Sequence, residues 1–209
     1  MSLMDKLIGA TVPLVPKPVV RQIAASYIAG ETLDEQVLAI KQLNGKHFMV
    51  ASSILGEDVT EKSESLEAVQ QYEEVLGTIA SQNLNSNIHV KLTHLGLNLD
   101  KEFCYKNVKR LLEKADSYDN FVRIDMEDSP TTDDTFDIFF RLNAEFENVG
   151  CVVQACLRRT TSDVQKLTAA KANVRICKGI YIEPPEIAYL DRGKIRENYA
   201  VLLLSLIHI

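Results

Sequence analysis

The stretch Val174-Arg175-Ile176-Cys177-Lys178-Gly179-Ile180-Tyr181 is a short apolar strand that ends in charged and polar residues. Three earlier segments share this design, and each places a polar side chain in its C-terminal half: residues 88–93 (IHVKLT), 121–127 (FVRIDME) and 151–155 (CVVQA). Barrels of parallel strands build their active sites at the C-terminal ends of the strands. The repeated pattern therefore predicts a parallel α/β enzyme.

Strand patterns fall at residues 47–52, 88–93, 121–126, 151–155 and 173–178, with helical patterns between them. Two of these helices are predicted from apolar residues three or four positions apart. The first buries Leu66, Val69, Tyr72, Leu76 and Ile79, and the second buries Phe136, Phe139 or Phe140, and Phe146. The strands are almost continuously apolar, as expected where both faces of a sheet are covered. The chain is therefore predicted to hold five βα units.

Such a sheet closes either as a doubly wound open sheet or as a barrel. Open sheets of this kind commonly carry a glycine-rich turn after the first strand, and none of the nine glycines forms a Gly-x-Gly sequence. The polar residues at successive strand ends favour the barrel. We therefore predict a (β/α)8 TIM-type barrel of the α/β class. It is incomplete here, because such a barrel typically needs about 250 residues.

The chain is expected to have three parts. Residues 1–45 form an N-terminal helical segment, with one helix between Pro18 and Ala29 and another from Leu33 to Leu43; residues 46–203 form the truncated barrel. Residues 204–209 (LSLIHI) resemble the translation of a sequencing adapter, and the alternative is an ordinary apolar helix end. Because three βα units are missing, we expect the chain alone to be inactive.

Composition is ordinary for a globular protein, with 46% hydrophobic and 25% charged residues. The net charge of −6 argues against nucleic acid as a partner, since phosphate binding needs clustered cations. No apolar run reaches the ~20 residues of a membrane span, and no signal-peptide pattern begins the chain. The four cysteines form no Cys-x-x-Cys pair and are expected to be structural thiols. A cytoplasmic location is predicted.

Alternation along the strands places Lys91, Asp125, Gln154 and Arg175 on one kind of face. Buried charges cost several kcal/mol unless they are paired or meet a ligand. Two interpretations follow. The four side chains converge on a ligand at the barrel mouth, or Asp125 forms an ion pair with Lys91 or Arg175 that merely closes the barrel top. Glu57 and Asp58 follow the first strand and are expected at the same rim.

Metal binding is the weaker prediction. Alternation also places Asp125 and Glu127 on the same face of an extended strand, as a divalent-metal pair would require, but no third ligand stands nearby. The histidines form neither His-x-His nor His-Glu-x-x-His, which argues against a zinc barrel. His89 and His94 are interpreted as ordinary residues flanking a strand. A metal-dependent barrel enzyme using Asp125 and Glu127, and a non-catalytic barrel fragment, remain alternative hypotheses.

Five segments at consecutive strand ends together resemble the proline dehydrogenase family: residues 55–57 (LGE), 90–92 (VKL), 124–127 (IDME), 153–155 (VQA) with Arg158-Arg159, and 175–181. Residues 27–31 (YIAGE) resemble its N-terminal helical region, and the likeness covers nearly all of residues 20–190 in order. The resemblance implies FAD-dependent oxidation of L-proline to 1-pyrroline-5-carboxylate, with hydride transfer to flavin N5. It also implies a quinone as electron acceptor and allows peripheral contact with a membrane.

The resemblance further implies a role for each matching residue. Asp125 and Arg175 are catalytic, with Arg175 near flavin N5, while Lys91 and Tyr181 bind the substrate and Glu57 pairs with an arginine late in the family's chain. The implied flavin contacts are Met126, Gln154, Arg175, Lys178, Gly179 and Ile180, and no metal is implied. The chain departs from the family at Cys177 and Ile180, where Val and Ala are usual. It also lacks the family's last helix, which carries two further substrate-binding arginines.

Overall fold

The structure is a computed structural model that describes residue 16 and residues 28–207. The chain divides into two compact units, residues 1–49 and 50–209. In the first unit, α3 (Leu33–Asn44) begins at a capping box. The Thr32 hydroxyl accepts from the Glu35 amide, and the Glu35 carboxylate accepts from the Thr32 amide. This helix matches the one predicted from Leu33, whereas the helix predicted between Pro18 and Ala29 lies almost entirely outside the described residues.

The second unit alternates strands and helices. Each predicted strand is present, with ends that differ from the prediction by three residues or fewer. The elements are β1 (Val50–Ser52), α4 (Lys62–Ser81), β2 (Ser86–Val90), α5 (Lys101–Asp116), β3 (Val122–Ile124), the 3-10 helix η2 (Ser129–Thr131), α6 (Thr132–Asn143), β4 (Val149–Gln154), α7 (Thr160–Ala169), β5 (Asn173–Cys177) and α8 (Arg192–Leu206). Helix α8 includes the first three residues of the segment 204–209.

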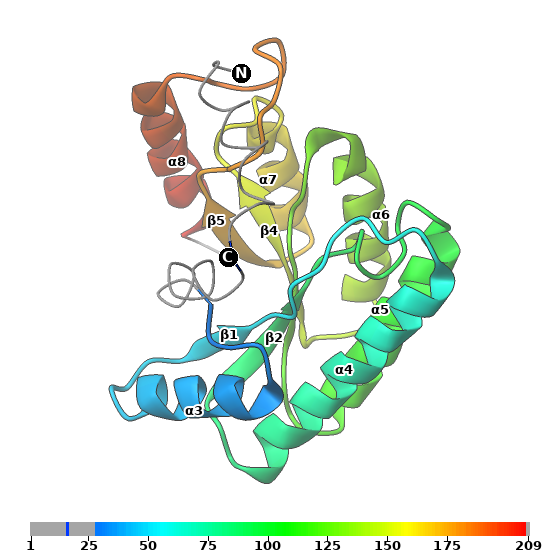
Figure 1. Ribbon diagram of the computed structural model, residues 1–209. Helices are drawn as coiled ribbons and strands as arrows, with labels where there is room; N and C mark the ends of the chain where they lie inside the picture. Colours follow the sequence, from blue (N-terminus) through cyan, green and yellow to red (C-terminus); the bar gives the residue numbers. More distant parts are fainter. Residues whose placement is uncertain (1–15, 17–27, 208–209) are drawn as a thin grey trace. The chain divides into compact units, whose positions relative to one another are not determined.

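All neighbouring strands are parallel, and their order in the sheet is β1-β2-β3-β4-β5. A doubly wound sheet reverses its strand order at a switch point, and this sheet has no reversal. Figure 1 shows that the sheet curls and that α4, α5, α6 and α7 lie along its outer side. The predicted incomplete (β/α) barrel is therefore confirmed as a curled half-barrel.

The core lies between the outer side of the sheet and the helices. Ile88, Val90, Val122 and Ile124 are fully buried there. Burying these side chains removes apolar surface from water, at about 25 cal/mol per Å². Because successive strand residues point to opposite faces, the residues between them point to the inner side of the curl. The sequence thus assigns its apolar residues to the helix side and its polar residues to the inner side.

The helical predictions are largely confirmed, with two corrections. Helix α4 buries Val69, Tyr72, Leu76 and Ile79, but Leu66 is 40% exposed. The buried stripe is centred on Ser65, Ala68 and Tyr72, which turns Leu66 towards solvent. In α6, Phe136 and Phe139 are buried as predicted, whereas Phe146 lies beyond the end of the helix and is half-buried.

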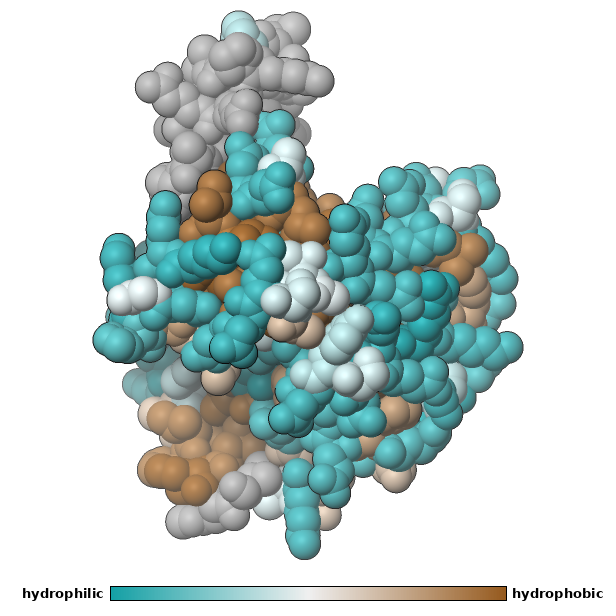
Figure 2. All heavy atoms as spheres, turned by 90° about the horizontal axis from the view of Figure 1, so that it is seen from below, coloured by the Kyte–Doolittle hydropathy of each residue, from teal (hydrophilic) through white to brown (hydrophobic). Residues whose placement is uncertain are grey.

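One face of the molecule is mostly polar. Hydrophilic residues dominate the face shown in Figure 2, and apolar residues gather in separate areas of it. Across the described residues, no helix combines the length and apolar character needed to cross a membrane.

Candidate active site at the carboxyl ends of the strands

Strand register brings the predicted site residues to one level of the inner face. Val90 pairs with Ile124, so Lys91 and Asp125 follow this pair together at the ends of β2 and β3. Ile124 of β3 pairs with Cys151 of β4. The next residue of β4, Val152, pairs with Arg175 of β5. Lys91, Asp125 and Arg175 therefore share one row across the sheet, on the side opposite the buried Val90 and Ile124.

Two ion pairs organise this row. Arg175 donates from Nη2 to Asp125 Oδ1 at 2.8 Å, and Lys91 donates from Nζ to the carboxylate of Glu57. Of the two pairings proposed for Asp125, the structure thus has the one with Arg175. Glu57 stands in the β1–α4 loop, which places that loop at the rim, as predicted. Side-chain exposures of 19% for Asp125 and 40% for Arg175 show that the pair faces an open space.

Arg175 retains most of its hydrogen-bonding capacity. A guanidinium carries five N–H donors, and within the described chain Arg175 uses one of them, on Asp125. Arg175 lies within β5, three residues before Lys178. An arginine held at one corner and free elsewhere is suited to binding an acceptor-rich or anionic group.

Glu127 is held apart from Asp125. Its carboxylate is buried and accepts from the Thr93 amide at 3.0 Å and from the Thr93 hydroxyl at 2.5 Å. The same hydroxyl accepts from the Asp58 amide at 3.1 Å, so Glu127 also helps to place the loop that carries Glu57. Burial raises the pKa of Glu127 above its ordinary value.

The two carboxylates of the predicted metal pair therefore have separate partners. Strand β3 ends at Ile124, so the alternation of an extended strand does not continue to Glu127. Asp125 turns to Arg175, and Glu127 turns to Thr93. The part of the chain that the structure describes contains no cluster of three or more potential metal-ligating side chains.

Gln154 joins the ends of β3 and β4. Its side chain is 2% exposed, and its Nε2 donates to the carbonyl oxygens of Met126 at 3.3 Å and Glu127 at 2.6 Å. The predicted contacts Met126 and Gln154 are thus brought together. Both N–H donors of Nε2 are already used on backbone carbonyls. The Gln154 side chain therefore holds the loop after β3 in place.

Gly179 lets the chain turn tightly over the end of β4. Its φ is +97°, and a Cβ added there would lie 2.2 Å from Cys156 Sγ and 2.9 Å from Gln154 Oε1. Only a residue without a side chain fits this path. The turn leaves Ile180 almost fully exposed beside it. Lys178, Gly179 and Ile180 are therefore placed as one bend at the rim.

Tyr181 is half-buried next to this bend. Burial, followed by the carboxylates of Glu127 and Asp125, raises the pKa of its phenol to about 12. Tyr181 therefore stays protonated at neutral pH, and these electrostatic contacts place it near the same carboxylates as the ion-pair row.

Two more inner-face residues lie in the same strands: His89, which was interpreted from the sequence as an ordinary strand-flanking residue, and Arg123, which was not predicted. His89 and Arg123 pair with each other in register, each two positions before a predicted site residue. Burial lowers the pKa of His89, Arg175 and Arg123 lower it further, and Asp125 opposes them. Its Nδ1 is buried without a hydrogen-bond partner among the described residues. The alternation that identified Lys91 and Asp125 also marks these two residues.

The cysteines take no part in an evident reactive centre. All four are free, and Cys104, Cys151 and Cys156 are buried. Burial raises the pKa of each thiol, including that of Cys151 to about 12. The thiol form therefore predominates at neutral pH.

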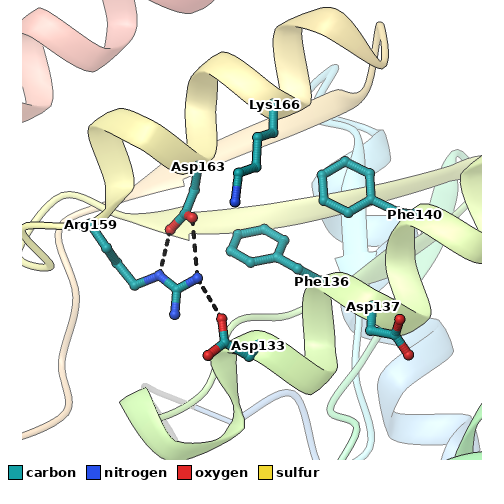
Figure 3. Close-up of a pocket in the computed structure, with 7 residues that line it drawn as sticks. All are labelled: Asp133, Phe136, Asp137, Phe140, Arg159, Asp163 and Lys166. Carbon is teal, nitrogen blue, oxygen red and sulfur yellow. Dashed lines mark hydrogen bonds and ion pairs between the residues drawn. The ribbon is translucent and has the colours of Figure 1, made fainter.

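A separate cavity of about 310 Å³ lies between α6 and α7, on the helix side of the sheet (Figure 3). Arg159 crosses it and donates to Asp163 at 2.8 and 3.2 Å and to Asp133 at 2.7 Å. Its other lining residues are Phe136, Asp137, Phe140 and Lys166. Among the lining groups, Arg159 is thus already engaged by two carboxylates, and the cavity is formed by residues of α6 and α7 and not by the strand ends.

Comparison with known proteins gives one family. A family model described as proline dehydrogenase matches residues 37–189. Proline dehydrogenase 2 from Bacillus subtilis (strain 168) is 33% identical over 183 residues, which cover 88% of this chain and 60% of that protein. Proline dehydrogenase from Deinococcus radiodurans is 28% identical over 188 residues, or 61% of that protein. The chain thus spans about three fifths of the length of these relatives.

Solved structures share the fold. Proline utilization A from Bdellovibrio bacteriovorus, inactivated by N-propargylglycine, matches with a TM-score of 0.79. The match is 24% identical and covers 90% of this chain and 25% of that chain. Proline utilization A from Corynebacterium freiburgense matches with a TM-score of 0.73 at 19% identity, covering 97% of this chain and 24% of that chain.

Proposed function

Because the chain belongs to the proline dehydrogenase family, we propose that the full-length product of its gene, hereafter the full-length protein, oxidises L-proline to 1-pyrroline-5-carboxylate with FAD as hydride acceptor. The observation that carries this proposal is the state of Arg175. It is a half-exposed guanidinium, fixed by Asp125 at 2.8 Å, whose remaining donors make no hydrogen bond within the described residues.

The residues present fit a flavin. A flavin ring has nitrogen and oxygen acceptors along one edge, and Arg175 offers unused N–H donors to such an edge. The tight bend at Gly179, where a Cβ would overlap Cys156, brings backbone close to the same space. When bound, FAD supplies a two-electron acceptor that the amino acids themselves lack. Arg175, Lys178, Gly179 and Ile180, with the backbone of Met126, would hold it, and Gln154 would support them.

Arg175 and Asp125 act together in this proposal. A fixed guanidinium stabilises negative charge that develops during hydride transfer, and it does so without reorganising at the moment of reaction. Asp125 supplies the fixing, because its carboxylate holds one corner of the guanidinium. It also balances the charge of Arg175 before substrate enters, which limits the cost of keeping a cation at the site.

Lys91 and Tyr181 form the substrate side of the proposal. Lys91 offers a point charge to the proline carboxylate, and its ion pair with Glu57 holds the ammonium at the rim until substrate arrives. Tyr181 remains a neutral phenol because its pKa is raised to about 12, so it presents a ring and an O–H donor rather than a negative charge. Glu57 is then free to pair with another cation once Lys91 binds substrate.

The metal-dependent alternative has less support. Glu127 is buried and fully engaged by Thr93, so recruiting it to a metal would break two hydrogen bonds. A quinone acceptor and peripheral membrane contact are also proposed, and they rest on the family resemblance alone. A cytoplasmic location is proposed from the sequence pattern, which has no signal-peptide motif and no Cys-x-x-Cys pair.

The visible spectrum of the full-length protein tests the proposal. We expect a flavin spectrum that bleaches when L-proline is added without oxygen, with 1-pyrroline-5-carboxylate formed in proportion. D-proline serves as the matched control ligand. A protein that remains colourless after incubation with FAD, or a bound flavin that L-proline leaves oxidised, would contradict the proposal. Activity restored by a divalent metal instead would favour the metal-dependent alternative.

A further inference from the structure

The segment that follows β5 is attached to the rest of the barrel at three places, the first of which is the Lys178 carbonyl, which accepts from the Cys156 amide at 2.9 Å. Near its far end, the Arg158 amide donates to the Ile187 carbonyl at 2.8 Å, and the Tyr189 amide donates to the Cys156 carbonyl at 2.7 Å. Nearer to β5, the carboxylate of Glu183 accepts from the Ser129 amide at 2.7 Å and from the Ser129 hydroxyl at 2.6 Å. Glu183 is 8% exposed, so water competes little for these hydrogen bonds.

The stretch between β5 and Glu183 has few contacts of its own. Ile180 and Ile182 are 88% and 95% exposed. Within the described residues, the side chain of Tyr181 makes no hydrogen bond that would orient it. The position of this stretch therefore depends on its attachments at either end, which are the Lys178 carbonyl before the bend at Gly179 and the Glu183 side chain after it.

The two hydrogen bonds between Glu183 and Ser129 are called the tie below. Ser129 comes directly after the loop that carries Asp125 and Met126. It is the first residue of η2, which leads into α6. Glu183 thus connects the loop after β3 with the loop after β5. Gln154 of β4 bonds to the carbonyls of Met126 and Glu127, which lie in the same loop after β3. The tie and the Gln154 hydrogen bonds fix three consecutive strand ends relative to one another.

We infer that Glu183, through its paired hydrogen bonds to Ser129, is a positioning residue that sets Tyr181 and the bend at Lys178–Ile180 against the loop of Asp125. This inference rests on the proposed function for its kinetic consequences. Glu183 itself is not expected to contact substrate, because both of its oxygens are already occupied by Ser129.

The chemistry of the tie suggests a matched pair of variants. In Glu183→Gln, the amide oxygen can still accept from the Ser129 amide, and the amide NH2 can donate to the Ser129 hydroxyl. Glu183→Ala removes both bonds. A positioning role requires the geometry of the tie and not its charge, so the glutamine variant should behave like the wild type and the alanine variant should not.

The test measures the full-length protein in two ways. Glu183→Ala should raise the KM for proline and the dissociation constant of a cyclic carboxylate lacking the amine by about tenfold, because a small displacement of groups that contact the ligand weakens its binding. In Glu183→Gln, the KM and the dissociation constant should stay within about twofold of the wild-type values. Trypsin cleavage after Lys178, followed by mass spectrometry, should be faster in Glu183→Ala and unchanged in Glu183→Gln.

Controls separate the tie from general destabilisation. Glu73→Ala removes a carboxylate that accepts two bonds from Arg110, at 2.8 and 2.6 Å, on the outer helices, and it should leave KM and cleavage after Lys178 unchanged. If Glu183→Ala fails to fold, Ser129→Ala can replace it, since this variant retains the hydrogen bond from the backbone amide. It should raise the KM for proline and the rate of cleavage after Lys178 by a smaller factor.

Unchanged KM and cleavage in the alanine variants would overturn the inference, as would a glutamine variant as impaired as Glu183→Ala. The cleavage assay needs no activity, so a wild-type protein that does not oxidise proline would count against the proposed function alone.

Discussion

Arg159 and Arg175 show how the same side chain serves two different regions of this barrel. Arg159, between α6 and α7, makes three hydrogen bonds to Asp133 and Asp163 (Figure 3). Arg175, at the end of β5, makes one to Asp125. Arg159 thus binds two neighbouring carboxylates, whereas Arg175 leaves most of its donors unused within the described residues. The candidate site thus differs from the helix-side cavity in the unused N–H donors of its arginine, and not in the charge of that arginine.

Other charges on the helix side follow the pattern of Arg159. Arg110 binds Glu73 through two nitrogens, and Arg141 binds Glu102 in the same way. Such exposed pairs typically contribute 0–1 kcal/mol to stability. The two regions should therefore respond differently to equivalent substitutions: kinetics should change at the strand ends, and little should change on the helices.

The largest expected difference concerns the two arginines themselves. In the full-length protein, Arg175→Met should slow flavin reduction by proline about a hundredfold, because one preorganised contact to developing charge is typically worth ~3 kcal/mol. Arg159→Met should leave this rate within about twofold of the wild type. Stopped-flow absorbance measures both. If Arg175→Met retains FAD and the wild-type rate, Arg175 does not stabilise the reacting flavin.

Two glycines provide the next comparison. Gly179→Ala should lower the free energy of unfolding by about 2 kcal/mol or more, because φ is +97° and the new Cβ would overlap Cys156 Sγ. Gly77→Ala, within α4, should raise it by about 1 kcal/mol, since the nearest atom to its Cβ is Tyr118 Oη at 3.7 Å. Urea unfolding of both variants measures the difference. Equal effects would show that the bend at Gly179 is not strained.

Lys91 tests whether the rim ion pairs are structural or exist to meet a ligand. Lys91→Met should weaken the binding of a proline-like carboxylate inhibitor by about tenfold. This factor is at the lower end of what the loss of a hydrogen bond to a charged group costs. The melting temperature should change little, because the abandoned partner Glu57 is 40% exposed and can be solvated. Inhibitor titration and thermal melts on this one variant distinguish a ligand-binding role of Lys91 from a structural one. A large drop in melting temperature with unchanged affinity would assign Lys91 a purely structural role.

The sequence was sufficient for most of the fold. Strand residues such as Val90 and Ile124 alternate with Lys91 and Asp125, and this period of two survives in the structure because each strand has one helix-facing side. The order of five βα units, together with the absence of a glycine fingerprint, pointed to a barrel. The row formed by Lys91, Asp125 and Arg175 could therefore be placed on one face before any coordinates were known.

The remaining details depend on distances that no local pattern encodes. Glu127 was assigned to the face of Asp125, but β3 ends too early and the side chain finds Thr93 in another loop. The tie of Glu183 to Ser129 joins residues 54 positions apart. Leu66 was misplaced because several helical stripes fit the same spacing, and only packing chooses between them. Loop partners and stripe centres thus required the structure.

The smallest expected effect concerns pH and a buried histidine at the rim. His94 is 9% exposed and packs edge-on against Tyr72, with ring centroids 6.5 Å apart. Burial, followed by the charge of Lys91, lowers its pKa below 6.5, and Glu64 partly opposes this. The folded protein therefore keeps His94 neutral where the unfolded chain is already protonated.

The sign of the effect follows from this difference in bound protons. The unfolded chain binds more protons below pH 6.5, so the stability linked to His94 is fully present above that pH. It is lost as the pH falls towards the folded pKa, by at most about 1.4 kcal/mol per pH unit. His94→Asn should flatten the decline in melting temperature between neutral and mildly acidic pH. Gly77→Ala, on the helix side, should shift the whole curve without changing its slope. A wild-type slope in His94→Asn would show that the decline originates elsewhere, and His89, whose pKa is lowered in the same direction, would be the next residue to replace.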